Sequence, residues 1–411
     1  MFWNLATLRF DKGWESLSKK KGPSSIVVQG IPSKYGSLGV DVEKRGIDRL
    51  KALTNDLFPQ SFCTVTRHPT REGVGAILHA DGAGTKPIVA YLYYKETGSP
   101  RAFSGLAQDV VAMNVDDIVC VGGTPLILSD YIALNPFTLE REALLGGLAD
   151  GFKAVLSSLA GQGHPILFGG GETADLPDIV RTFDVSATVY GEVGLDSVIT
   201  GDSISPGDVI VGLRSGGRAK GEGRENSGIM CNGITLARHS LLSPKYLKRY
   251  PEVGSGRAGG YFGSFELSSE PDGLGMTVGE ALLSPTRIYL PLARRLVAGG
   301  GVKALVHNTG GGMTKCKRLG KGIRYVKDML PEPDPVFKLI HEGSHEGWGE
   351  MYRAFNMGIG LEVVVPGERA PEIISVSESF GIEACVIGRC DRSTSGQNTV
   401  LIKSPLGTFE Y

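Results

Sequence analysis

The distribution of glycine constrains the fold of this chain more than any other sequence feature. The chain has 59 glycines among 411 residues, about twice the usual share of ~7%. The glycines gather in short clusters between periodic segments and do not form a repeat. Strand-like and helix-like segments therefore alternate around glycine-rich turns. This pattern indicates an α/β or α+β protein whose binding loops are lined by backbone.

The most informative cluster is Asp81-Gly82-Ala83-Gly84-Thr85-Lys86, between two apolar runs that we predict as strands, 75–78 and 88–93. A carboxylate at a strand end, followed by glycines, a hydroxyl and an ammonium, suits a phosphate and a metal ion. Asp81 is suited to hold Mg²⁺, which prefers hard oxygen ligands and phosphate oxygens. Lys86 is suited to neutralise phosphate charge. Taken alone, a hairpin turn without a ligand is the alternative.

Apolar spacing predicts the other elements of the first half. Residues 41–57 and 103–113 are predicted as helices, because their apolar side chains recur on one face. Thr138 is predicted to begin a third, longer helix. A short buried strand is predicted at 165–168, and an alternating, half-buried strand at 182–189.

The turn Ser205-Pro206-Gly207-Asp208 separates two strand patterns and is predicted as the domain boundary. Beyond it we predict strands at 209–211 and 361–365 and a helix at 286–298. A chain of this length exceeds one hydrophobic core. We therefore expect an N-terminal arm and two domains, with the bounds 1–34, 35–206 and 207–411.

Three acidic residues near the end of the second predicted helix form a further candidate site. Asp109 and Asp116 are seven positions apart and should share a helix face, with Asp117 adjacent. Carboxylates beside an apolar stripe repel one another unless a cation compensates. Metal coordination and a solvated helix face are the two interpretations.

Two more glycine clusters each follow an apolar run. Gly169–Thr173 places bare backbone N–H groups at a strand end, with Glu172 as a further oxygen ligand; a strand exit without a ligand is the alternative. His307–Gly312 follows the run 302–306, and its turn is suited to bind an anion through backbone amides.

Composition and motifs exclude several classes of protein. The 43 Lys and Arg residues nearly balance 44 Asp and Glu residues, which predicts no nucleic-acid or polybasic membrane surface. The six cysteines form no C-x-x-C pair, as expected in a reducing cytosol. No apolar run approaches the roughly 20 residues of a membrane span. No P-loop string occurs, and a G-x-G-x-x-G match beginning at Gly254 follows no strand and is expected by chance. We expect a cytoplasmic protein.

Seven segments, in this order, resemble the aminoimidazole ribonucleotide synthetase family, whose other name is phosphoribosylformylglycinamidine cyclo-ligase. The first three nucleotide-side motifs also occur in related ATP-using enzymes, whereas P-T-R-I-Y and M-Y-R-x-F-N are more particular to the cyclo-ligase. The segments are 35–41 (Y-x-x-x-G-V-D), 81–86 (D-G-x-G-T-K), 109–117 (D-x-V-A-M-x-V-x-D), 170–177 (G-G-E-T-A), 283–289 (P-T-R-I-Y), 307–312 (H-x-T-G-G-G) and 351–360 (M-Y-R-x-F-N-x-G-x-G).

The resemblance implies a two-domain α+β fold of the PurM-like type. The N-terminal sheets of two chains would pair into a barrel across a homodimer, and the C-terminal domain would be an α/β sandwich. The implied reaction is ATP- and Mg²⁺-dependent ring closure of formylglycinamidine ribonucleotide in purine synthesis, with no nucleic-acid or membrane partner.

The resemblance also implies the roles of individual residues. The implied metal ligands are Asp81, Asp116, Asp117 and Glu172, and the implied ATP ligands are Gly82, Gly84, Thr85, Lys86, Asp109, Gly170 and Gly171. The implied substrate ligands are Asn232, Gly233, Thr309, Gly310, Gly311 and Gly312, and the implied catalytic residues are Asp81, Lys86, Asp117 and His307.

The chain departs from the family pattern between the domains. Family members carry S-G-x-H-S-N-G, but here a polar insertion separates Ser215-Gly216 from Ser227–Gly233, and Met230 stands where the histidine would be. A thioether cannot shuttle a proton as imidazole does. The histidine is therefore dispensable, or His307 or the basic insertion replaces it, or the reaction differs. Asp116 also replaces the usual asparagine.

Two further functions stay open. One is a related small-molecule kinase of the same superfamily, in which phosphate remains on the substrate. The other is a non-catalytic nucleotide-binding protein, which Met230 motivates.

Overall fold

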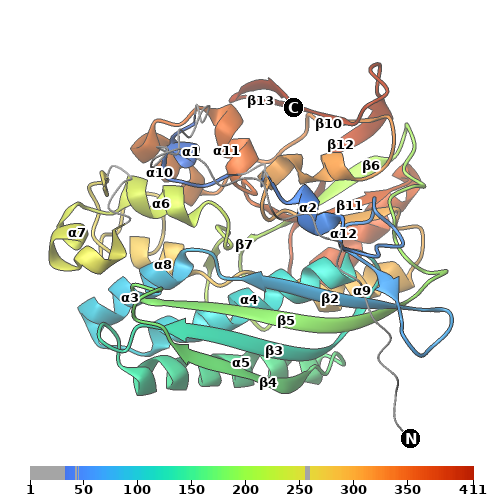
Figure 1. Ribbon diagram of the computed structural model, residues 1–411. Coiled ribbons are helices and arrows are strands. Elements are labelled where there is room, and N and C mark those ends of the chain that lie inside the picture. Colours follow the sequence, from blue (N-terminus) through green and yellow to red (C-terminus); the bar gives the residue numbers. More distant parts are fainter. Residues whose placement is uncertain (1–32, 42–43, 45, 255–259) are drawn as a thin grey trace, which may run out of the picture. The chain divides into compact units, whose positions relative to one another are not determined.

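Two large β-sheets organise the part of the chain that this computed structural model describes, residues 33–41, 44, 46–254 and 260–411 (Figure 1). Most of the predicted arm, residues 42, 43 and 45 of the first predicted helix and part of the chance glycine motif lie outside the described residues. The strands of the first sheet are β1 (Thr66–Arg67), β2 (Val74–Gly82), β3 (Thr124–Leu134), β4 (Leu167–Asp175) and β5 (Phe183–Gly194).

The first sheet has the strand order β1-β2-β5-β3-β4 and is open at both edges. β2 and β3 pair with β5 in antiparallel fashion, and β4 joins β3 in parallel. Along β5 buried residues alternate with partly exposed ones, as expected for a sheet with helices on one face. The opposite face exposes apolar side chains from three strands, including Leu78, Tyr131 and Leu167.

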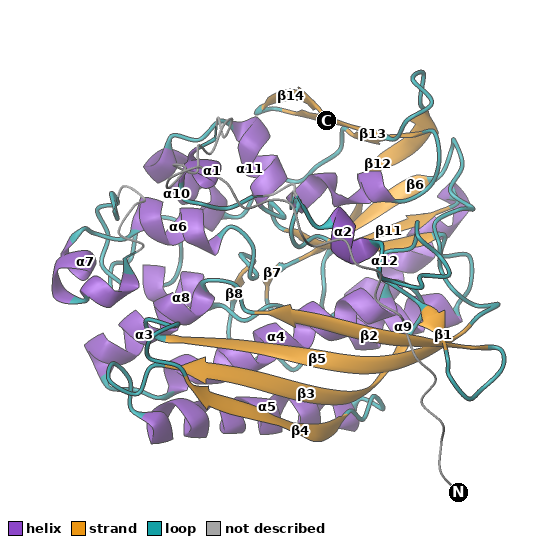
Figure 2. Cartoon of the chain, viewed as in Figure 1, coloured by secondary structure: helices purple, strands orange, loops and turns teal. Residues whose placement is uncertain are grey.

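Helices α3 (Lys86–Thr97), α4 (Arg101–Val119) and α5 (Arg141–Gly161) cover the face of this sheet that is opposite to the exposed side chain of Leu78 (Figure 2). α4 confirms the helix predicted at 103–113 and extends it to Val119. α5 confirms the helix predicted from Thr138, although its first residue is Arg141. Among the described helices, α5 alone is long and apolar enough to cross a membrane, with a mean hydropathy of 1.3. Here it contacts α4 through one apolar face.

The run 88–93 was predicted as a strand, and this prediction is wrong because it lies in α3. Pro87 stands in the first turn of that helix, and Gly98 ends it with a positive φ of 67°. Five of the first seven residues of this helix, 86–92, are apolar and buried. A short apolar run bounded by turn residues cannot by itself distinguish a buried helix from a strand.

Two other predicted elements also differ from the structure. Of the helix predicted at 41–57, only α2 (Asp48–Lys51) is present among the described residues. Leu53 is 77% exposed, so the apolar side chains of this segment do not pack against the core as their spacing predicted. The strand predicted as buried at 165–168 is β4, an edge strand that begins at Leu167 and continues through the glycines. Leu167 is 67% exposed on it.

The second sheet contains the C-terminal half of the chain and has the order β14-β13-β10-β12-β6-β11-β9. Its strands include those predicted at 209–211 and 361–365, and the chain passes from the first sheet to the second between Gly194 and Val209. β11 is buried along its whole length, so the sheet is covered on both faces. The strands are β6 (Val209–Arg214), β9 (Ala304–His307), β10 (Ile323–Lys327), β11 (Ile359–Val365), β12 (Ala384–Arg392), β13 (Thr399–Ser404) and β14 (Gly407–Glu410).

Shorter elements surround this second sheet. A small antiparallel pair, β7 (Gly216–Gly217) and β8 (Asn226–Ser227), closes the base of the polar insertion. The helix predicted at 286–298 is present as α9, but it begins only at Leu290. The remaining helices are α1 (Lys34–Ser37), α6 (Ile234–Leu241), α7 (Lys245–Arg249), η1 (Pro251–Val253), α8 (Val278–Leu283), α9 (Leu290–Ala298), η2 (Gly312–Arg318), α10 (Pro335–Ser344), α11 (Trp348–Ala354), η3 (Gly367–Arg369) and α12 (Ala370–Ser379).

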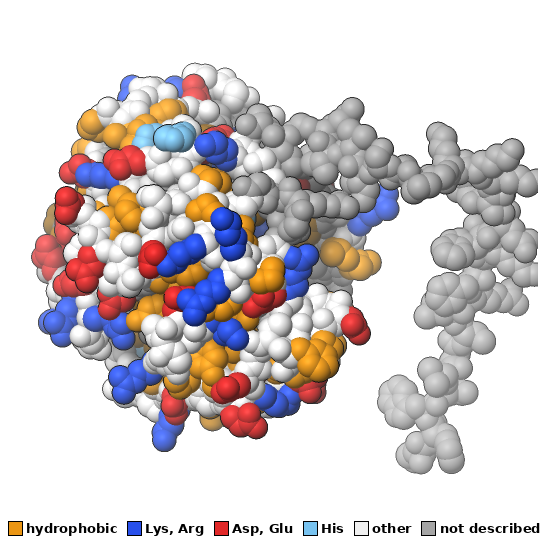
Figure 3. All heavy atoms as spheres, turned by 90° about the vertical axis from the view of Figure 1, so that its left-hand side faces the viewer, with side chains coloured by type: hydrophobic (Ala, Val, Ile, Leu, Met, Phe, Trp, Pro, Cys, Tyr) orange, Lys and Arg blue, Asp and Glu red, His pale blue; other side chains and the backbone are white. Residues whose placement is uncertain are grey.

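Basic and acidic side chains are interspersed on the face that carries α6, α7 and α10 (Figure 3). The described part of the chain is therefore a mixed α+β structure with two sheets, and α4 contacts elements of both. The first sheet is open and forms no closed barrel in one chain.

Candidate active site

Four segments from both halves of the chain meet around the carboxylate of Asp117, near the end of α4. His307, at the end of β9, has its Nδ1 atom 2.8 Å from Asp117 Oδ1. His79 on β2 has its Nε2 atom 3.4 Å from Asp117 Oδ2, and Lys315 on η2 has its Nζ atom 3.8 Å from the same oxygen. We call Asp117, His79, His307 and Lys315 the Asp117 cluster.

The electrostatics of the cluster favour an ionised Asp117. Burial alone would raise its pKa, but the Lys315 ammonium and hydrogen bonds from His307 and His79 hold the pKa well below its usual range. With Asp117 ionised, His307 carries its hydrogen on Nδ1 and donates it. His307 Nε2 is then a lone-pair nitrogen, fully buried and without a hydrogen-bond partner among the described residues. Burial lowers the pKa of His307 more than Asp117 raises it.

His79 behaves differently from His307. Its Nδ1 atom lies 3.0 Å from Asn114 Oδ1, and an amide oxygen only accepts, so this nitrogen carries a hydrogen. The Nε2 contact with Asp117 is then favourable when this nitrogen is protonated as well. Burial works against that charge, but hydrogen bonds to Asp117 and Asn114 raise the pKa of His79 overall.

Asp81 lies at the end of β2, two residues beyond His79 and so on the same face of the strand. Its Oδ1 atom accepts the N–H of Gly82 at 2.8 Å. Burial raises the pKa of Asp81, the Gly82 N–H lowers it, and nearby Asp117 raises it again. The prediction that Asp81 and Asp117 come from separate segments to one place agrees with this mutual influence.

The predicted phosphate and substrate loops lie against one another. Thr85 Oγ1 is 2.8 Å from Thr235 Oγ1 on α6, and a Cβ added at Gly84 would contact the carbonyl oxygen of Cys231 at 3.5 Å. A Cβ added at Gly310 would lie 3.9 Å from Asn232 Oδ1. Loop 82–86 therefore meets loop 231–235, which in turn meets loop 309–312.

Two glycines of these loops have no room for any side chain. Gly233 has a φ of +74°, and a Cβ there would overlap the ring of Phe355. Gly312 has a φ of +51°, and a Cβ there would overlap the carbonyl oxygens of Phe355 and Tyr352. Both positions combine a backbone conformation that favours glycine with close packing.

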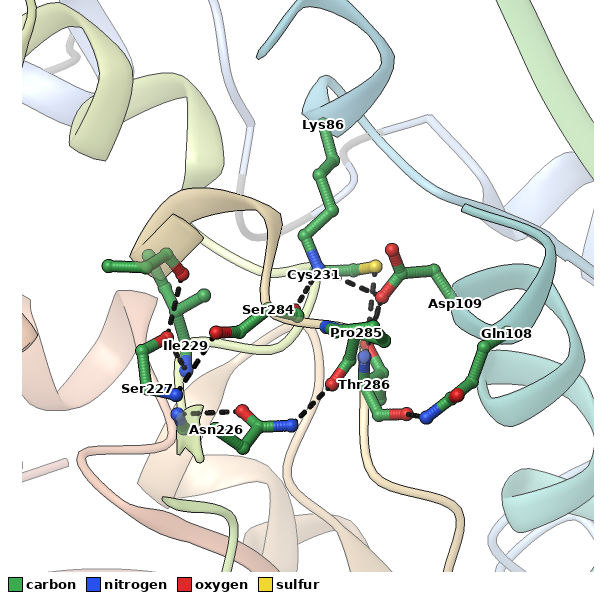
Figure 4. Close-up of polar contacts among 12 residues, drawn as sticks. Lys86, Gln108, Asp109, Asn226, Ser227, Ile229, Cys231, Ser284, Pro285 and Thr286 are labelled. Atoms are coloured by element: carbon green, nitrogen blue, oxygen red, sulfur yellow. Dashed lines mark hydrogen bonds and ion pairs between the residues drawn. The ribbon is translucent and has the colours of Figure 1, made fainter. Parts of the chain in front are cut away.

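Lys86 does not face the predicted phosphate site, which corrects one of the implied roles. Its side chain is fully buried, its Nζ atom is 2.8 Å from Asp109 Oδ1, and it also donates to the carbonyl oxygen of Ser284 at 2.6 Å (Figure 4). Asp109, also fully buried, accepts the N–H and the hydroxyl of Thr286 at 2.7 Å each. Both partners are enclosed by protein, so neither is available to ATP in this conformation.

Asp109 and Asp116 share a helix face, as predicted, and each accepts a backbone N–H from the segment that precedes α9. Both oxygens of Asp116 accept the N–H of Tyr289, at 2.9 and 3.0 Å, while Asp109 holds Thr286 three residues earlier. The two carboxylates therefore anchor segment 284–289 on α4, which explains why helix α9 begins only at Leu290. Burial raises the pKa of Asp116 well above its usual value.

Glu172, Gly170 and Gly171 lie apart from the Asp117 cluster within one chain. The register places Asp81 opposite Ala187, Ala187 opposite Asp130, and Asp130 opposite Gly171. Three strand spacings, or about 14 Å, therefore separate Asp81 from β4. Glu172 is exposed on this edge strand and cannot share an ion with Asp81 of the same chain.

The donor set bears on the expected magnesium ion. Among the described residues, no group of three or more His, Cys, Asp or Glu side chains is arranged to hold a metal. Mg²⁺ at nucleotide sites is commonly held by one or two carboxylates and by phosphate oxygens. Asp81 fits this arrangement, because among the described residues only the N–H of Gly82 is hydrogen-bonded to its carboxylate, whereas both oxygens of Asp117 contact other side chains.

The polar insertion is held at its base. Arg287 binds Glu222 of the insertion, with Nε 2.8 Å from Oε1 and Nη2 2.7 Å from Oε2. Asp334 pairs with Arg214, and Cβ atoms added at Gly216 or Gly228 would lie within 2.8 Å of Asp334 Oδ2. Burial raises the pKa of Asp334 to about 6, although Arg214 opposes that shift.

Met230, at the place of the family histidine, is 1% exposed and has a φ of +60°. The thioether is therefore packed in the protein interior, and the backbone conformation is one that is uncommon outside glycine. A groove of about 1300 Å³ lies elsewhere, between α5, the insertion and residues 284–288, and contains neither Asp81 nor Asp117.

Sequence reasoning missed His79, Asn114 and Lys315. His79 had a readable signal, because it stands two residues before Asp81 on the same strand face. Lys315 had a weaker one, since it follows the glycine turn by three residues in a 3₁₀ helix, where such positions align. Asn114, buried at 0% exposure, links β2 to α4 by donating to the carbonyl oxygen of Asp81 at 3.2 Å.

Comparison with known proteins identifies the class. Residues 63–193 match the family model "AIR synthase related protein, N-terminal domain", and residues 205–400 match the corresponding C-terminal domain. The chain belongs to the AIR synthase related proteins, with their two-domain PurM-like fold. Its likeness to aminoimidazole ribonucleotide synthetase, read from seven motifs, is thereby confirmed.

The curated relatives are more specific. The chain is 35% identical to phosphoribosylformylglycinamidine cyclo-ligase of Methanococcus maripaludis strain C6, over 80% of this chain and 82% of the relative. It is 37% identical to the protein of that name from Methanocaldococcus jannaschii, over 76% and 77%. It is 32% identical to that from Methanobrevibacter smithii, over 92% and 97%.

Solved structures share the fold at lower identity. T. maritima PurL complexed with FGAR matches with a TM-score of 0.55 and 13% identity, over 92% of this chain and 51% of that chain. The HypE–HypF complex matches with a TM-score of 0.52 and 14% identity, over 89% and 97%.

Proposed function

We propose that this chain catalyses the ATP-dependent cyclisation of formylglycinamidine ribonucleotide to 5-aminoimidazole ribonucleotide, a step of purine synthesis. The observation that carries the proposal is the identity of 32–37% to proteins named phosphoribosylformylglycinamidine cyclo-ligase, over most of both chains. The glycine loops of the characteristic motifs lie together beside the Asp117 cluster, which supports it.

The proposed chemistry has two steps. The γ-phosphoryl group of ATP moves to the formyl amide oxygen of the substrate, releasing ADP and making that oxygen a good leaving group. The neighbouring amidine nitrogen then attacks the formyl carbon, a C–N bond forms, and phosphate leaves with the former amide oxygen. One proton is lost from the attacking nitrogen. Positioning and neutralisation of phosphoryl charge supply most of the acceleration.

His307 is the proposed acceptor of that proton. Its Nε2 atom is buried and unpartnered, and Asp117 holds the ring by its Nδ1 hydrogen, 2.8 Å away. A neutral imidazole fixed in this way by a carboxylate is a suitable general base. The backbone of Gly82, Gly84 and Thr85 is proposed to contact ATP. Asn232, Gly233 and the turn 309–312 are proposed to contact the ribonucleotide.

Asp81 is the proposed carboxylate ligand of Mg²⁺. The ion would supply positive charge that stabilises the transferring phosphoryl group. Asp117 is proposed to orient His307, and His79 and Asn114 to hold β2 and α4 together beneath the site.

The open face of the first sheet is the proposed homodimer interface. Leu78 is 72% exposed and Leu167 67% exposed, and apolar side chains gathered on one sheet face commonly mark an association surface. Pairing two such sheets would form a barrel from two chains. The domain boundary near 206–207, the α/β sandwich and a cytoplasmic location belong to the same proposal. Leu167→Glu should shift the dimer towards monomer in sedimentation analysis, whereas the exposed Phe137→Glu at a loop should not.

The direct test is product formation. Purified protein with ATP, Mg²⁺ and formylglycinamidine ribonucleotide should release ADP and phosphate and produce an amine that can be diazotised. Product that retains the phosphoryl group would identify a small-molecule kinase. Binding of ATP without turnover would identify a non-catalytic protein. Either result overturns the cyclo-ligase proposal.

A further inference from the structure

Because Lys86 is paired with Asp109 in the protein interior, another positively charged side chain is needed to neutralise a phosphate at the ligand loops. Lys315 lies on η2, directly after the glycine turn, and its side chain is 7% exposed. Its Nζ atom donates to Thr309 Oγ1, within the turn itself. A Cβ added at Gly311 would contact Lys315 Cβ at 3.9 Å, so the stem of the lysine follows the turn.

The hydrogen bonds of this ammonium are incomplete. An ammonium has three donors, and among the described residues the structure records one hydrogen bond for Lys315, to Thr309. Asp117 Oδ2 is 3.8 Å away, too far for a hydrogen bond, and it already faces His79. The ring of Phe62 lies 4.4 Å from Nζ and supports the cation on another side.

A second donor, on a segment beside the same turn, has no hydrogen-bond partner among the described residues. Asn232 Nδ2 is buried and makes no hydrogen bond among the described residues, while Asn232 Oδ1 faces Gly310. A buried donor without an acceptor is costly unless a ligand supplies one. The amide donor of Asn232, the ammonium of Lys315 and the glycine backbone of the turn thus belong to segments that contact one another. A ligand that only accepts hydrogen bonds and carries negative charge would satisfy all three.

We propose that Lys315 and Asn232 bind a phosphate group at the turn Thr309–Gly312, with Lys315 supplying the charge that the buried Lys86 cannot. The inference rests on the proposed function for the identity of the phosphate, which is either the monoester of the ribonucleotide or a phosphate of ATP. Lys315 in this role stands between Asp117 and the bound phosphate and keeps the two anions apart.

The test uses the full chain with Lys315→Gln, Lys315→Arg and, as a matched control, Lys317→Gln, since Lys317 is exposed on the same element. Titration calorimetry measures binding of formylglycinamidine ribonucleotide, of the same compound without its phosphate, and of ATP with Mg²⁺. Lys315→Gln should weaken the ribonucleotide by roughly ten- to a hundredfold, the size of one charge-assisted hydrogen bond, and leave the dephosphorylated compound unchanged. Lys315→Arg should recover much of the loss.

The outcomes show which ligand supplies the bound phosphate and which results overturn the inference. Weakening of ATP in place of the ribonucleotide supports the inference and assigns the phosphate to the nucleotide. Equal weakening of the ribonucleotide and its dephosphorylated form, or no weakening of any ligand, overturns it.

A wild-type chain that binds no ribonucleotide would refute the proposed function alone. Inorganic phosphate then serves as the probe. It should raise the melting temperature of wild type and Lys317→Gln but not of Lys315→Gln, and a wild type that phosphate leaves unchanged overturns the inference.

Discussion

Replacing Lys86 by methionine tests whether this lysine stabilises the fold or binds a ligand. The change keeps most of the side-chain volume and removes the charge that pairs with Asp109 at 2.8 Å. Both side chains are fully buried, so Asp109 would keep a carboxylate without its cation. Removing one partner of a buried pair costs about 3–5 kcal/mol. The free energy of unfolding of Lys86→Met should fall by that amount.

Equilibrium unfolding in urea measures this difference without any ligand. Lys95→Met is the control, because Lys95 is exposed on the same helix and its loss should change stability by less than about 0.5 kcal/mol. The double variant Lys86→Met, Asp109→Asn removes both charges and retains an amide oxygen for Thr286. It should recover more than half of the loss.

A Lys86→Met variant with a wild-type urea midpoint and weakened ATP binding would refute the reasoning. Such a result would mean that the lysine leaves Asp109 when nucleotide binds. Equal destabilisation by the single and double variants would also contradict the charge argument and point to lost packing.

Three further outcomes are expected. Burial raises the pKa of Asp334 to about 6, so the protonated carboxyl stabilises the fold fully below pH ~4, and this stabilisation is lost as the pH rises through 6. Between pH 4 and 7, the free energy of unfolding of wild type should therefore fall by up to roughly 3 kcal/mol relative to Asp334→Asn, as measured by urea titration. Gly312→Ala should lower the melting temperature and turnover, because the added Cβ would overlap the carbonyl oxygen of Phe355. Gly146→Ala, in open space on α5, should instead stabilise the protein by about 0.5–1 kcal/mol. Equal melting temperatures of these two variants would contradict this reasoning. Glu362→Gln removes the carboxylate that balances the buried ammonium of Lys327, which also donates to the carbonyl oxygen of Met313. This change should cost about 3–5 kcal/mol by the same measurement, and an unchanged midpoint would exclude a structural role for the charge pair.

Sequence reasoning was most successful where the spacing of residues depends on the geometry of a single helix or strand. The seven-residue interval of Asp109 and Asp116 correctly placed both on one helix face, and apolar periodicity located α4 and α5. It was wrong at the run 88–93, because an apolar run in a buried helix has no polar face to reveal its period.

The partners of charged side chains were not readable from the sequence. Lys86 and Ser284 are 198 positions apart, and His307 and Asp117 are 190 apart. The motif therefore identified Lys86 as important but could not distinguish a ligand contact from a buried ion pair. Likewise, β4 looks equivalent to β2 in sequence, and only the strand order reveals that two strands separate them.

The hairpin base formed by β7 and β8 has a practical consequence for engineering. Gly216 pairs with Ser227, and Asp334 fills the space beside both ends, so the geometry of the neighbouring backbone is set before the insertion begins. Residues 223–225 are exposed and can then vary in number while Glu222 keeps its bond to Arg287, because doubling a flexible loop costs only about 0.6 kcal/mol. This tip is accordingly a place to graft a fluorophore or an affinity tag.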